Sequence, residues 1–240
     1  MQFTQTDISN LNEILSICGL VDINAVVISD TQLSGVNNDR TCAMIVKSKI
    51  PVLAEGVKLG LSNLNILSQR LDIFKTDVKL GIEAALGKTS DIASLTIKGA
   101  KASTQFRATN PAAIKCPTSI NDTPVKEVII SRDEAGIILN AIRAMSAKKL
   151  TIVIKKNNDV TLELSDKVND LFQIGLENQA KNLGESERAF TSYYFTEALS
   201  SLLKAAAAES DLISITVCEA SARLTVNGYE LTLISPMDND

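Results

Sequence analysis

The sequence contains no histidine. A Ser-His-Asp triad and a Cys-His pair both need imidazole as the base, and an H-E-x-x-H zinc site needs it as a ligand. The chain also has neither a G-x-x-x-x-G-K-[ST] phosphate loop nor a G-x-G-x-x-G turn after a strand. These absences exclude most classes of enzyme and predict a protein without a catalytic site or a cofactor.

Cysteine is scarce and scattered. The four cysteines, Cys18, Cys42, Cys116 and Cys218, form no C-x-x-C pair and have no histidine with which to complete a zinc site. We therefore expect reduced, mostly buried thiols in a cytosolic protein, and no bound metal.

Long apolar runs and an excess of positive charge are missing as well. No stretch approaches the roughly 18 apolar residues that cross a membrane, and residues 1–5 lack the basic and apolar regions of a signal peptide. A soluble, cytoplasmic chain with no membrane partner is expected. The net charge of -4 and the pI near 5.1 argue against binding nucleic acid through bulk positive charge, so any DNA contact would be local.

What the sequence does contain is an internal repeat. One apolar stripe with helical +3, +4, +3 steps occurs twice, 127 residues apart, as Ile8, Leu11, Leu15 and Cys18 and again as Ala135, Ile138, Ile142 and Met145. A second stripe with +3, +4 steps recurs 135 residues later, as Leu64, Leu67 and Leu71 and again as Leu199, Leu202 and Ala206. Each copy is thus predicted to carry two helices that bury one face.

Strand-like segments surround these helices in the same order in both copies. The expected helices are the first one, carrying the stripe from Ile8 to Cys18, and 62–74, 132–147 and 196–208. The expected strands cover 24–29, 41–47, 52–61, 78–84, 93–98, 102–107, 125–130, 150–155, 160–164, 171–176, 189–195, 212–217, 222–226 and 229–235. Asn227-Gly228 is a strong hairpin signal, and 178–187 is expected to be an exposed loop.

The length and the repeat together predict two domains. At 240 residues the chain fits two units of about 120 residues. The stretch 109–124 is rich in Pro, Thr, Asn and Ser and has no apolar period, so it is expected to connect domain 1–108 to domain 125–240. Each domain is expected to be α+β, with two helices packed on antiparallel sheet.

This arrangement resembles the DNA sliding clamps of the proliferating-cell-nuclear-antigen and phage T4 type. The segment AVVISDTQLSGVNNDR at 25–40 is similar to the family's strand, turn and strand after the first helix. Also similar are 61–74 followed by DVKL, and the ending LTLISP at 231–236 with its short acidic tail. The resemblance covers nearly the whole chain through its order and pattern.

The resemblance implies a closed ring of six such domains, with helices lining the hole. Two domains per chain then imply a homotrimer. Edge strands would pair between subunits, which by family correspondence joins Ser103, Gln105 and Arg107 of one chain to Phe172 and Ile174 of the next. In the alternative interpretation, the strands 102–107 and 171–176 are both edge strands that are covered within one chain.

The helices that the resemblance places around the hole carry few cations. The DNA-facing residues are expected to be Arg70, Lys75, Arg143, Lys148 and Lys204. The first helix exposes none, which departs from the family's pattern of several Lys or Arg on every inner helix. The lining would be polar and only weakly basic, giving weak, salt-sensitive attraction to phosphate. Each of these cations could also be an ordinary solvated charge.

Clamps of this family bind partner peptides in an apolar pocket beside the connector and the C-terminal residues. Mapped onto this sequence, the pocket is lined by Val36, Ile120, Leu233 and Pro236. Ordinary packing is the alternative role for each of them.

The function that the resemblance implies is that of a DNA polymerase processivity factor. The expected partners are a second and third copy of the chain, double-stranded DNA without sequence preference, a DNA polymerase and a clamp-loader ATPase. The short, divergent chain suggests a viral or phage source, in which case the cytoplasm would be that of the host cell.

Two other functions stay open. One is a clamp-fold interaction or assembly module that does not encircle DNA. The other is an enzyme based on carboxylates and lysines, for example around Asp30, Asp39 and Lys47, although these residues also suit turns and solvent-facing positions. The pair Asp133-Glu134 follows Ser131 at a predicted helix start, where capping explains it.

Overall fold

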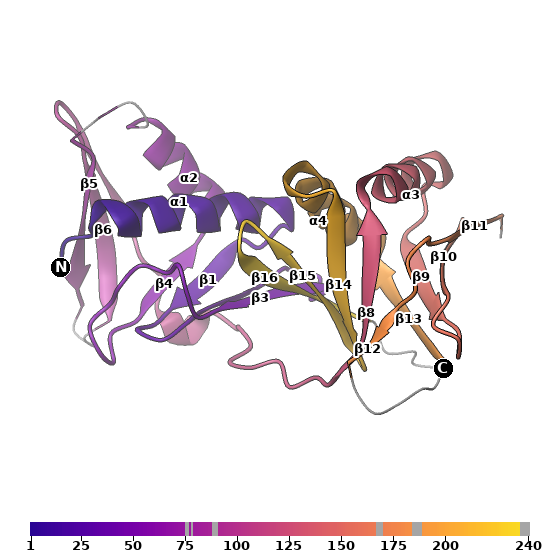
Figure 1. The fold of residues 1–240 in the computed structure, drawn as a ribbon. Coiled ribbons are helices and arrows are strands. Elements are labelled where there is room, and N and C mark those ends of the chain that lie inside the picture. Colours follow the sequence, from indigo (N-terminus) through magenta and orange to yellow (C-terminus); the bar gives the residue numbers. More distant parts are fainter. Residues whose placement is uncertain (75–76, 78, 88–90, 167–169, 184–188, 236–240) are drawn as a thin grey trace. The chain divides into compact units, whose positions relative to one another are not determined.

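The computed structural model divides into two compact units, the first formed by Met1–Asn38 and Ala43–Ser119 and the second by Asp39–Cys42 and Ile120–Asp240. The structure describes residues 1–74, 77, 79–87, 91–166, 170–183 and 189–235. Each unit contains two helices and antiparallel strands, as the repeat predicts (Figure 1).

The first unit begins with helix α1 and ends with a short 3-10 turn. Its helices are α1 (Gln5–Leu20) and α2 (Leu64–Asp72). Its strands are β1 (Ala25–Ile28), β2 (Leu33–Val36), β3 (Cys42–Val46), β4 (Leu59–Ser62), β5 (Gly81–Leu86), β6 (Ile92–Lys98) and β7 (Ser103–Arg107). The strands pair in the orders β4-β1-β2-β3 and β5-β6-β7. The 3-10 turn is Pro111–Ala113.

The second unit repeats this plan with additional strands. Its helices are α3 (Arg132–Met145) and α4 (Thr196–Glu209). Its strands are β8 (Pro124–Ser131), β9 (Lys149–Ile154), β10 (Val160–Ser165), β11 (Leu171–Gly175), β12 (Lys181–Asn182), β13 (Phe190–Phe195), β14 (Leu212–Cys218), β15 (Ser221–Val226) and β16 (Tyr229–Ile234). They pair in the orders β13-β9-β10-β11 and β12-β8-β14-β15-β16. The order β13-β9-β10-β11 corresponds to β4-β1-β2-β3 of the first unit, and β14-β15-β16 corresponds to β5-β6-β7.

The apolar stripes of the repeat form the core of both units. The four stripe residues of α1 are 0–6% exposed, and those of α2 and α4 are buried too. On α3, Ala135 and Ile138 are fully buried whereas Ile142 and Met145 are half-buried. Burying each Leu or Ile side chain stabilises the fold by about 1.5–3 kcal/mol. Cys18, Cys42 and Cys218 are buried and Cys116 is half-buried, in agreement with the sequence prediction.

The repeat extends to the polar residues that start α1 and α3. Thr4 and Asp7 form a capping box on α1, and 127 positions later Ser131 and Glu134 form one on α3. In each case the second carboxylate oxygen of the acid accepts an N–H from a distant segment, 2.8 Å from Val52 for Asp7 and 2.8 Å from Glu177 for Glu134. The two acids therefore fasten the helix starts to the segments that follow β3 and β11.

Both of these acids, Asp7 and Glu134, are buried and negatively charged. Burial alone would raise the pKa of Asp7, but the hydrogen bonds from the Thr4 side chain, the Val52 N–H and the Thr4 N–H outweigh it and lower that pKa. Burial likewise opposes ionisation of Glu134, and the N–H groups of Glu177 and Ser131 and the Ser131 hydroxyl lower its pKa.

Four segments differ from the strands and loops predicted from the pattern, the first being 33–36, which forms β2 although the pattern predicts no strand there. The run 52–61 is a strand only over its last residues, because a turn with Gly56 at φ 75° interrupts it. The polar stretch 178–187 contains β12, which pairs with β8 through Lys181 and Asn182. The expected extended connector contains the 3-10 turn, whose Pro111 is buried.

A buried lysine explains why β12 forms in a polar stretch. Lys126 on β8 is 0% exposed, and its Nζ donates to Oδ1 of Asn158 at 2.8 Å and to Oδ1 of Asn182. A buried ammonium needs such acceptors. β12 supplies one of them, so the lysine and the short strand stabilise each other.

Candidate functional site

Strand β7, predicted to lie at a subunit interface, is an edge strand of its sheet. The N–H of Ala108 donates to Ala93 on the β6 side. Because backbone groups alternate in direction along a strand, those of Ser103, Gln105 and Arg107 point away from β6, toward the open edge. These are the three interface residues that the sequence predicts on this strand, and their side chains are exposed.

Strand β11 is likewise an edge strand, next to β10. The N–H of Leu176 donates to Val160, so Phe172 and Ile174 direct their backbone groups toward β10 and keep half-buried side chains. Leu171, Gln173 and Gly175 present the outward backbone groups. Any backbone pairing at this edge would thus use these three residues, while the predicted residues Phe172 and Ile174 would contribute apolar side chains.

Arg70, predicted to face DNA, lies against β7. Its guanidinium is 5.6 Å from the centroid of the Phe106 ring, and its Nη1 donates to the carbonyl of Gln105. That carbonyl points to the open edge. The sequence gives no signal for this contact, because residues 70 and 105 belong to different elements.

The other predicted DNA-facing residues are in the second unit or outside the described residues. Arg143 and Lys204 are exposed on α3 and α4, on the faces opposite their buried stripes. Lys148 is exposed just after α3, and its carbonyl accepts the N–H of Thr196 at the start of α4. Lys75 lies outside the described residues.

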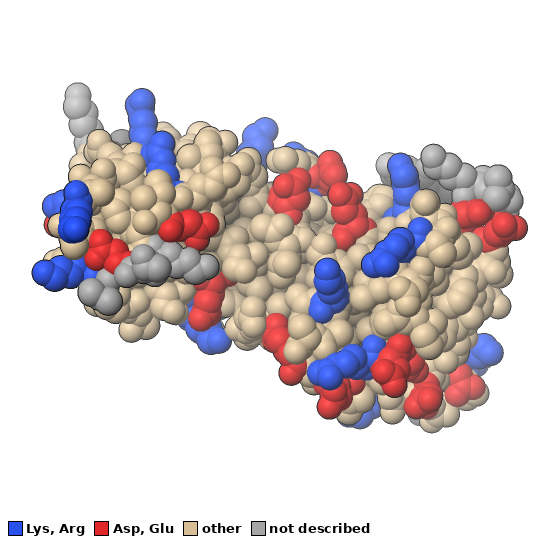
Figure 2. Space-filling view, turned by 90° about the horizontal axis from the view of Figure 1, so that it is seen from above, with Lys and Arg blue, Asp and Glu red and all other residues tan. Residues whose placement is uncertain are grey.

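The helix faces of the two units are not strongly basic. In the view of Figure 2, Lys and Arg are interspersed with Asp and Glu, and broad areas of surface carry neither. Arg132 on α3 forms a salt bridge with Asp211, with 2.9 Å between Nη1 and Oδ1. The exposed face of α1 carries Ser9, Glu13 and Ser16. Attraction to DNA at these helices would therefore rest on a few separate cations.

The residues of the predicted peptide pocket are distributed over both units. Val36 ends β2 in the first unit and is half-buried. In the second unit Ile120 is half-buried and Leu233 on β16 is 1% exposed, opposite Ala222 of β15. Pro236 lies outside the described residues. The pocket stays a prediction.

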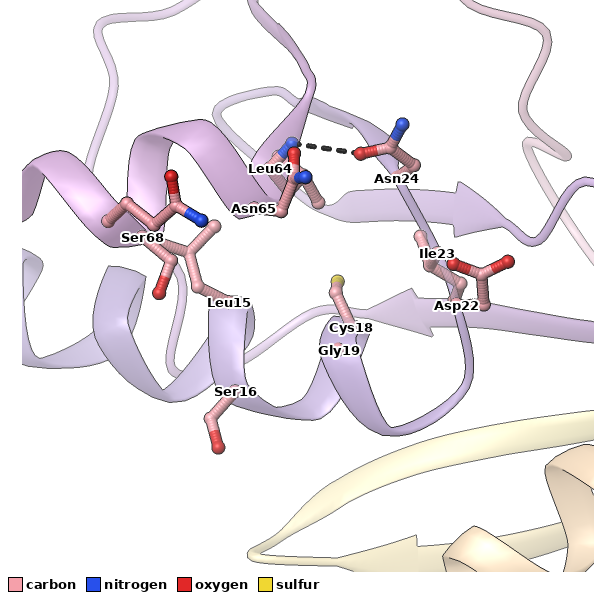
Figure 3. Close-up of a pocket in the computed structure, with 11 residues that line it drawn as sticks. Leu15, Ser16, Cys18, Gly19, Asp22, Ile23, Asn24, Leu64, Asn65 and Ser68 are labelled. Carbon is pink, nitrogen blue, oxygen red and sulfur yellow. Dashed lines mark hydrogen bonds between the residues drawn. The ribbon is translucent and has the colours of Figure 1, made fainter.

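A cavity of about 480 Å³ with a mixed polar and apolar lining lies between α1 and α2 (Figure 3). Its walls come from the last turns of α1, including Leu15 and Ser16, and from the face of α2 that carries Asn65, Ser68 and Gln69. Asn24 closes the start of α2, where its Oδ1 accepts the N–H of Leu64 at 3.1 Å. None of the predicted site residues that the structure describes lines this cavity.

The carboxylate and lysine set considered for an enzyme does not come together. Asp30 precedes β2 and Asp39 follows it, so a strand of about 13 Å separates them. Within the described residues, no group of three or more His, Cys, Asp or Glu side chains could hold a metal ion. No helix in the described part of the chain is long and apolar enough to span a membrane.

Comparison with known proteins identifies the fold. No family model and no curated protein matches the sequence. The chain is similar to the crystal structure of proliferating cellular nuclear antigen from Entamoeba histolytica, with 15% identity, a TM-score of 0.63 and 98% of each chain covered. It is also similar to the structure of the C-terminal region of FEN-1 bound to A. fulgidus PCNA, with 16% identity, a TM-score of 0.62, and 99% of this chain and 98% of that chain covered.

The protein therefore has the sliding-clamp fold. The predicted α+β class and the resemblance to clamps are confirmed over nearly the whole chain. Both solved structures are clamps rather than enzymes, which agrees with the prediction of a non-enzymatic protein.

Proposed function

We propose that this chain is the protomer of a homotrimeric ring that encircles duplex DNA, slides along it and tethers a DNA polymerase. The observation that carries the proposal is the pair of open edges: within the described residues, β7 and β11 each pair on one side only, in a chain with the sliding-clamp fold. Three outward-facing residues on β7 match three on β11, enough for a short intermolecular ladder.

The two edges differ, which determines the kind of assembly they support. Joining β7 of one copy to β11 of another is a head-to-tail contact, and such contacts give either a closed ring or an open filament. With two clamp units per chain, closure at six units requires three chains. Closure would also remove both exposed edges, which otherwise favour aggregation.

The proposed partners follow from this topology. A ring retains DNA by enclosing it, so a weakly basic helix face is sufficient. A DNA polymerase, other DNA enzymes and an ATP-driven loader are the proposed protein partners, in the cytoplasm. One of the similar structures contains the C-terminal region of FEN-1 bound to a clamp. That observation supports a peptide-binding role for the predicted pocket of Val36, Ile120, Leu233 and Pro236.

The assembly is tested by light scattering over a concentration series. We expect a mass three times that of the 25.8 kDa chain. Gln105→Pro removes an outward N–H from β7 and should yield monomers at concentrations where the unaltered chain is trimeric. A chain that stays monomeric at the highest concentration would overturn the ring.

Encirclement is tested without a loader on linear duplex DNA biotinylated at both ends. Streptavidin is added either before the protein, which blocks threading, or after it, which traps threaded rings. We expect retention in high salt only when the ends are blocked afterwards, and release by a single restriction cut. A stable trimer with no retention would instead favour the interaction module that does not encircle DNA.

A further inference from the structure

One face of the sheet β13-β9-β10-β11 in the second unit is uncovered in the described part of the chain. Side chains alternate in direction along a strand. The buried residues of β9 thus face the core, whereas Lys149, Thr151 and Val153 face the opposite side and are at least partly exposed. In the register of the sheet, Phe195 of β13 lies beside Lys149, and Tyr193 lies beside Thr151. We call this side of the sheet the outer face.

The corresponding face of the first unit is covered by the residues that follow β7. Gly60 and Ser62 of β4 occupy the places of Tyr193 and Phe195, because they pair with the third and first residues of β1 as the aromatic pair does with those of β9. The N–H of Thr109 donates to the carbonyl of Gly60, and a Cβ at Gly60 would collide with Thr109. Small residues thus leave room for a covering segment in the first unit, whereas the second unit places two aromatic rings on an open sheet.

The two rings and a lysine form a cluster on the outer face. Tyr193 and Phe195 are two residues apart on one side of β13, which is about 7 Å along the strand. The ammonium group of Lys149 lies 4.9 Å from the centroid of the Tyr193 ring. The Oγ of Ser235 donates to the carbonyl of Tyr193 at 3.0 Å, and β9 pairs with the whole of β13. The cluster therefore presents two half-buried rings on a fixed backbone.

Three exposed lysines lie around the cluster. Lys149 begins β9, Lys155 follows the end of β9 on the same side, and Lys156 is next in the turn. None of them forms a salt bridge with any residue that the structure describes. Two acids lie among them, Glu163 on β10 and Asp159 in the turn, and each already accepts hydrogen bonds from side-chain amides. Lys149 and Lys155 are about 20 Å apart along the strand, so cations flank both ends of the face.

These features match what single-stranded nucleic acid requires of a protein surface. Unpaired bases stack on exposed aromatic rings, and lysines along the same groove neutralise the phosphates. Two neighbouring rings between cations suit a few successive nucleotides that lie along β13 and β9. A duplex keeps its bases stacked on each other and has none to place on the rings. An apolar peptide would cover the rings but leave the three lysines without a counter-charge, so charge complementarity favours the nucleic acid.

We propose that the outer face of β13-β9 binds single-stranded DNA without sequence preference. One base stacks on Tyr193 and the next on Phe195, while Lys149 moves from the tyrosine ring to a phosphate. Lys155 and Lys156 neutralise phosphates farther along the strand. The helices α3 and α4 pack on the other side of this sheet, so the site is separate from their exposed cations. It adds affinity for unpaired DNA to a protein that we propose encloses duplex DNA, and it does not depend on ring closure.

Binding of a short, dye-labelled oligothymidine, followed by fluorescence anisotropy, tests the proposal. Tyr193→Leu and Phe195→Leu keep the apolar bulk but remove the ring, so each should weaken binding about five- to 150-fold. Tyr193→Phe keeps the ring and should bind like the unaltered chain. An abasic oligonucleotide of the same length retains the phosphates without the bases. It should bind the unaltered chain about as weakly as oligothymidine binds the double leucine variant.

The lysines are tested through the salt dependence of binding. Lys149→Ala should reduce the slope of log K against log salt by about 0.7, the contribution of one phosphate in a single strand. Glu163→Gln removes a negative charge from the face and should strengthen binding. The matched control is Arg143→Ala combined with Lys204→Ala on the helices, which should leave oligothymidine binding unchanged. Unchanged thermal unfolding of the leucine variants shows that their loss of binding is not a loss of folding.

Several outcomes would overturn the proposal. Equal binding of the abasic oligonucleotide and oligothymidine would mean that no base stacks on the rings. Loss of binding in the control on α3 and α4, with none in the leucine variants, would place the single strand at the helices instead. If the unaltered chain does not bind oligothymidine but Tyr193→Leu weakens its binding to a DNA polymerase, the outer face is a protein-docking surface. A monomeric chain that binds oligothymidine in the expected way would remove the ring and leave this site standing.

Discussion

Lys126 depends on two asparagines for its burial. Its ammonium group is fully enclosed and bonded to the side-chain oxygens of Asn158 and Asn182. We expect Lys126→Ala to lower the free energy of unfolding by about 2–4 kcal/mol, because it leaves a cavity and removes the donor of both side-chain hydrogen bonds. Urea denaturation measures the loss. Lys155→Ala, an exposed lysine on the same β9–β10 turn as Asn158, should change stability by less than about 0.5 kcal/mol.

Two glycines should respond in opposite directions to the same substitution. A Cβ at Gly60 on β4 would collide with the carbonyl oxygen of Thr109, whereas a Cβ at Gly136 inside α3 would meet open space. Gly60→Ala should destabilise the first unit by about 1–3 kcal/mol, and Gly136→Ala should stabilise the chain by about 0.5–1 kcal/mol through its helix propensity. Thermal unfolding of both variants checks the signs, and equal signs would contradict the local geometry.

At the scale of elements, the carboxylates of Asp7 and Glu134, which hold the starts of α1 and α3, make the stability of the fold depend on pH. Hydrogen bonds lower the folded-state pKa of Asp7 and of Glu134 below the ordinary values of 3.8 and 4.5. Their contribution is therefore complete above those ordinary values and is lost as the pH falls through the folded-state pKa. Asp7→Asn and Glu134→Gln should each cost about 0.5–2 kcal/mol at pH 7 and progressively less toward pH 3.

Urea denaturation at a series of pH values measures this difference. Asp133→Asn is the matched control, because Asp133 is an exposed acid in the same first turn of α3. Variant and wild-type curves that stay parallel from pH 7 to pH 3 would show that the two carboxylates hold no such charge-dependent bonds.

Sequence alone predicted the elements well wherever periodicity determines them. The apolar stripes are buried, and Asn227-Gly228 forms its turn with both residues at positive φ, at 53° and 79°. Long-range polar contacts were missed. Nothing near Asp7 indicates that its carboxylate holds Val52, and nothing near residue 70 indicates an edge strand that begins 33 residues later. Such contacts depend on tertiary placement, which a helical wheel does not contain.

At the scale of the whole molecule, the attraction to DNA should be weak, and its salt dependence should report how many phosphates the protein neutralises. Each neutralised phosphate contributes about 0.9 to the slope of log K against log salt, so replacing both Arg143 and Lys204 by Ala should reduce that slope by about 1.8. Binding of short, open-ended duplexes at several salt concentrations measures it. Lys155→Ala with Lys156→Ala, two exposed cations away from the helices, is the control. An unchanged slope in the helix variant would remove Arg143 and Lys204 from the proposed DNA face.

The difference between the edges of β7 and β11 has a genetic consequence. A copy altered only on β7 still offers an intact β11, so it can join normal copies and then prevent closure. When altered and normal copies are made in equal amounts, only about one trimer in eight contains three normal chains. A defect confined to one edge should therefore be dominant, whereas a copy that has lost both edges is excluded from assembly and should be recessive.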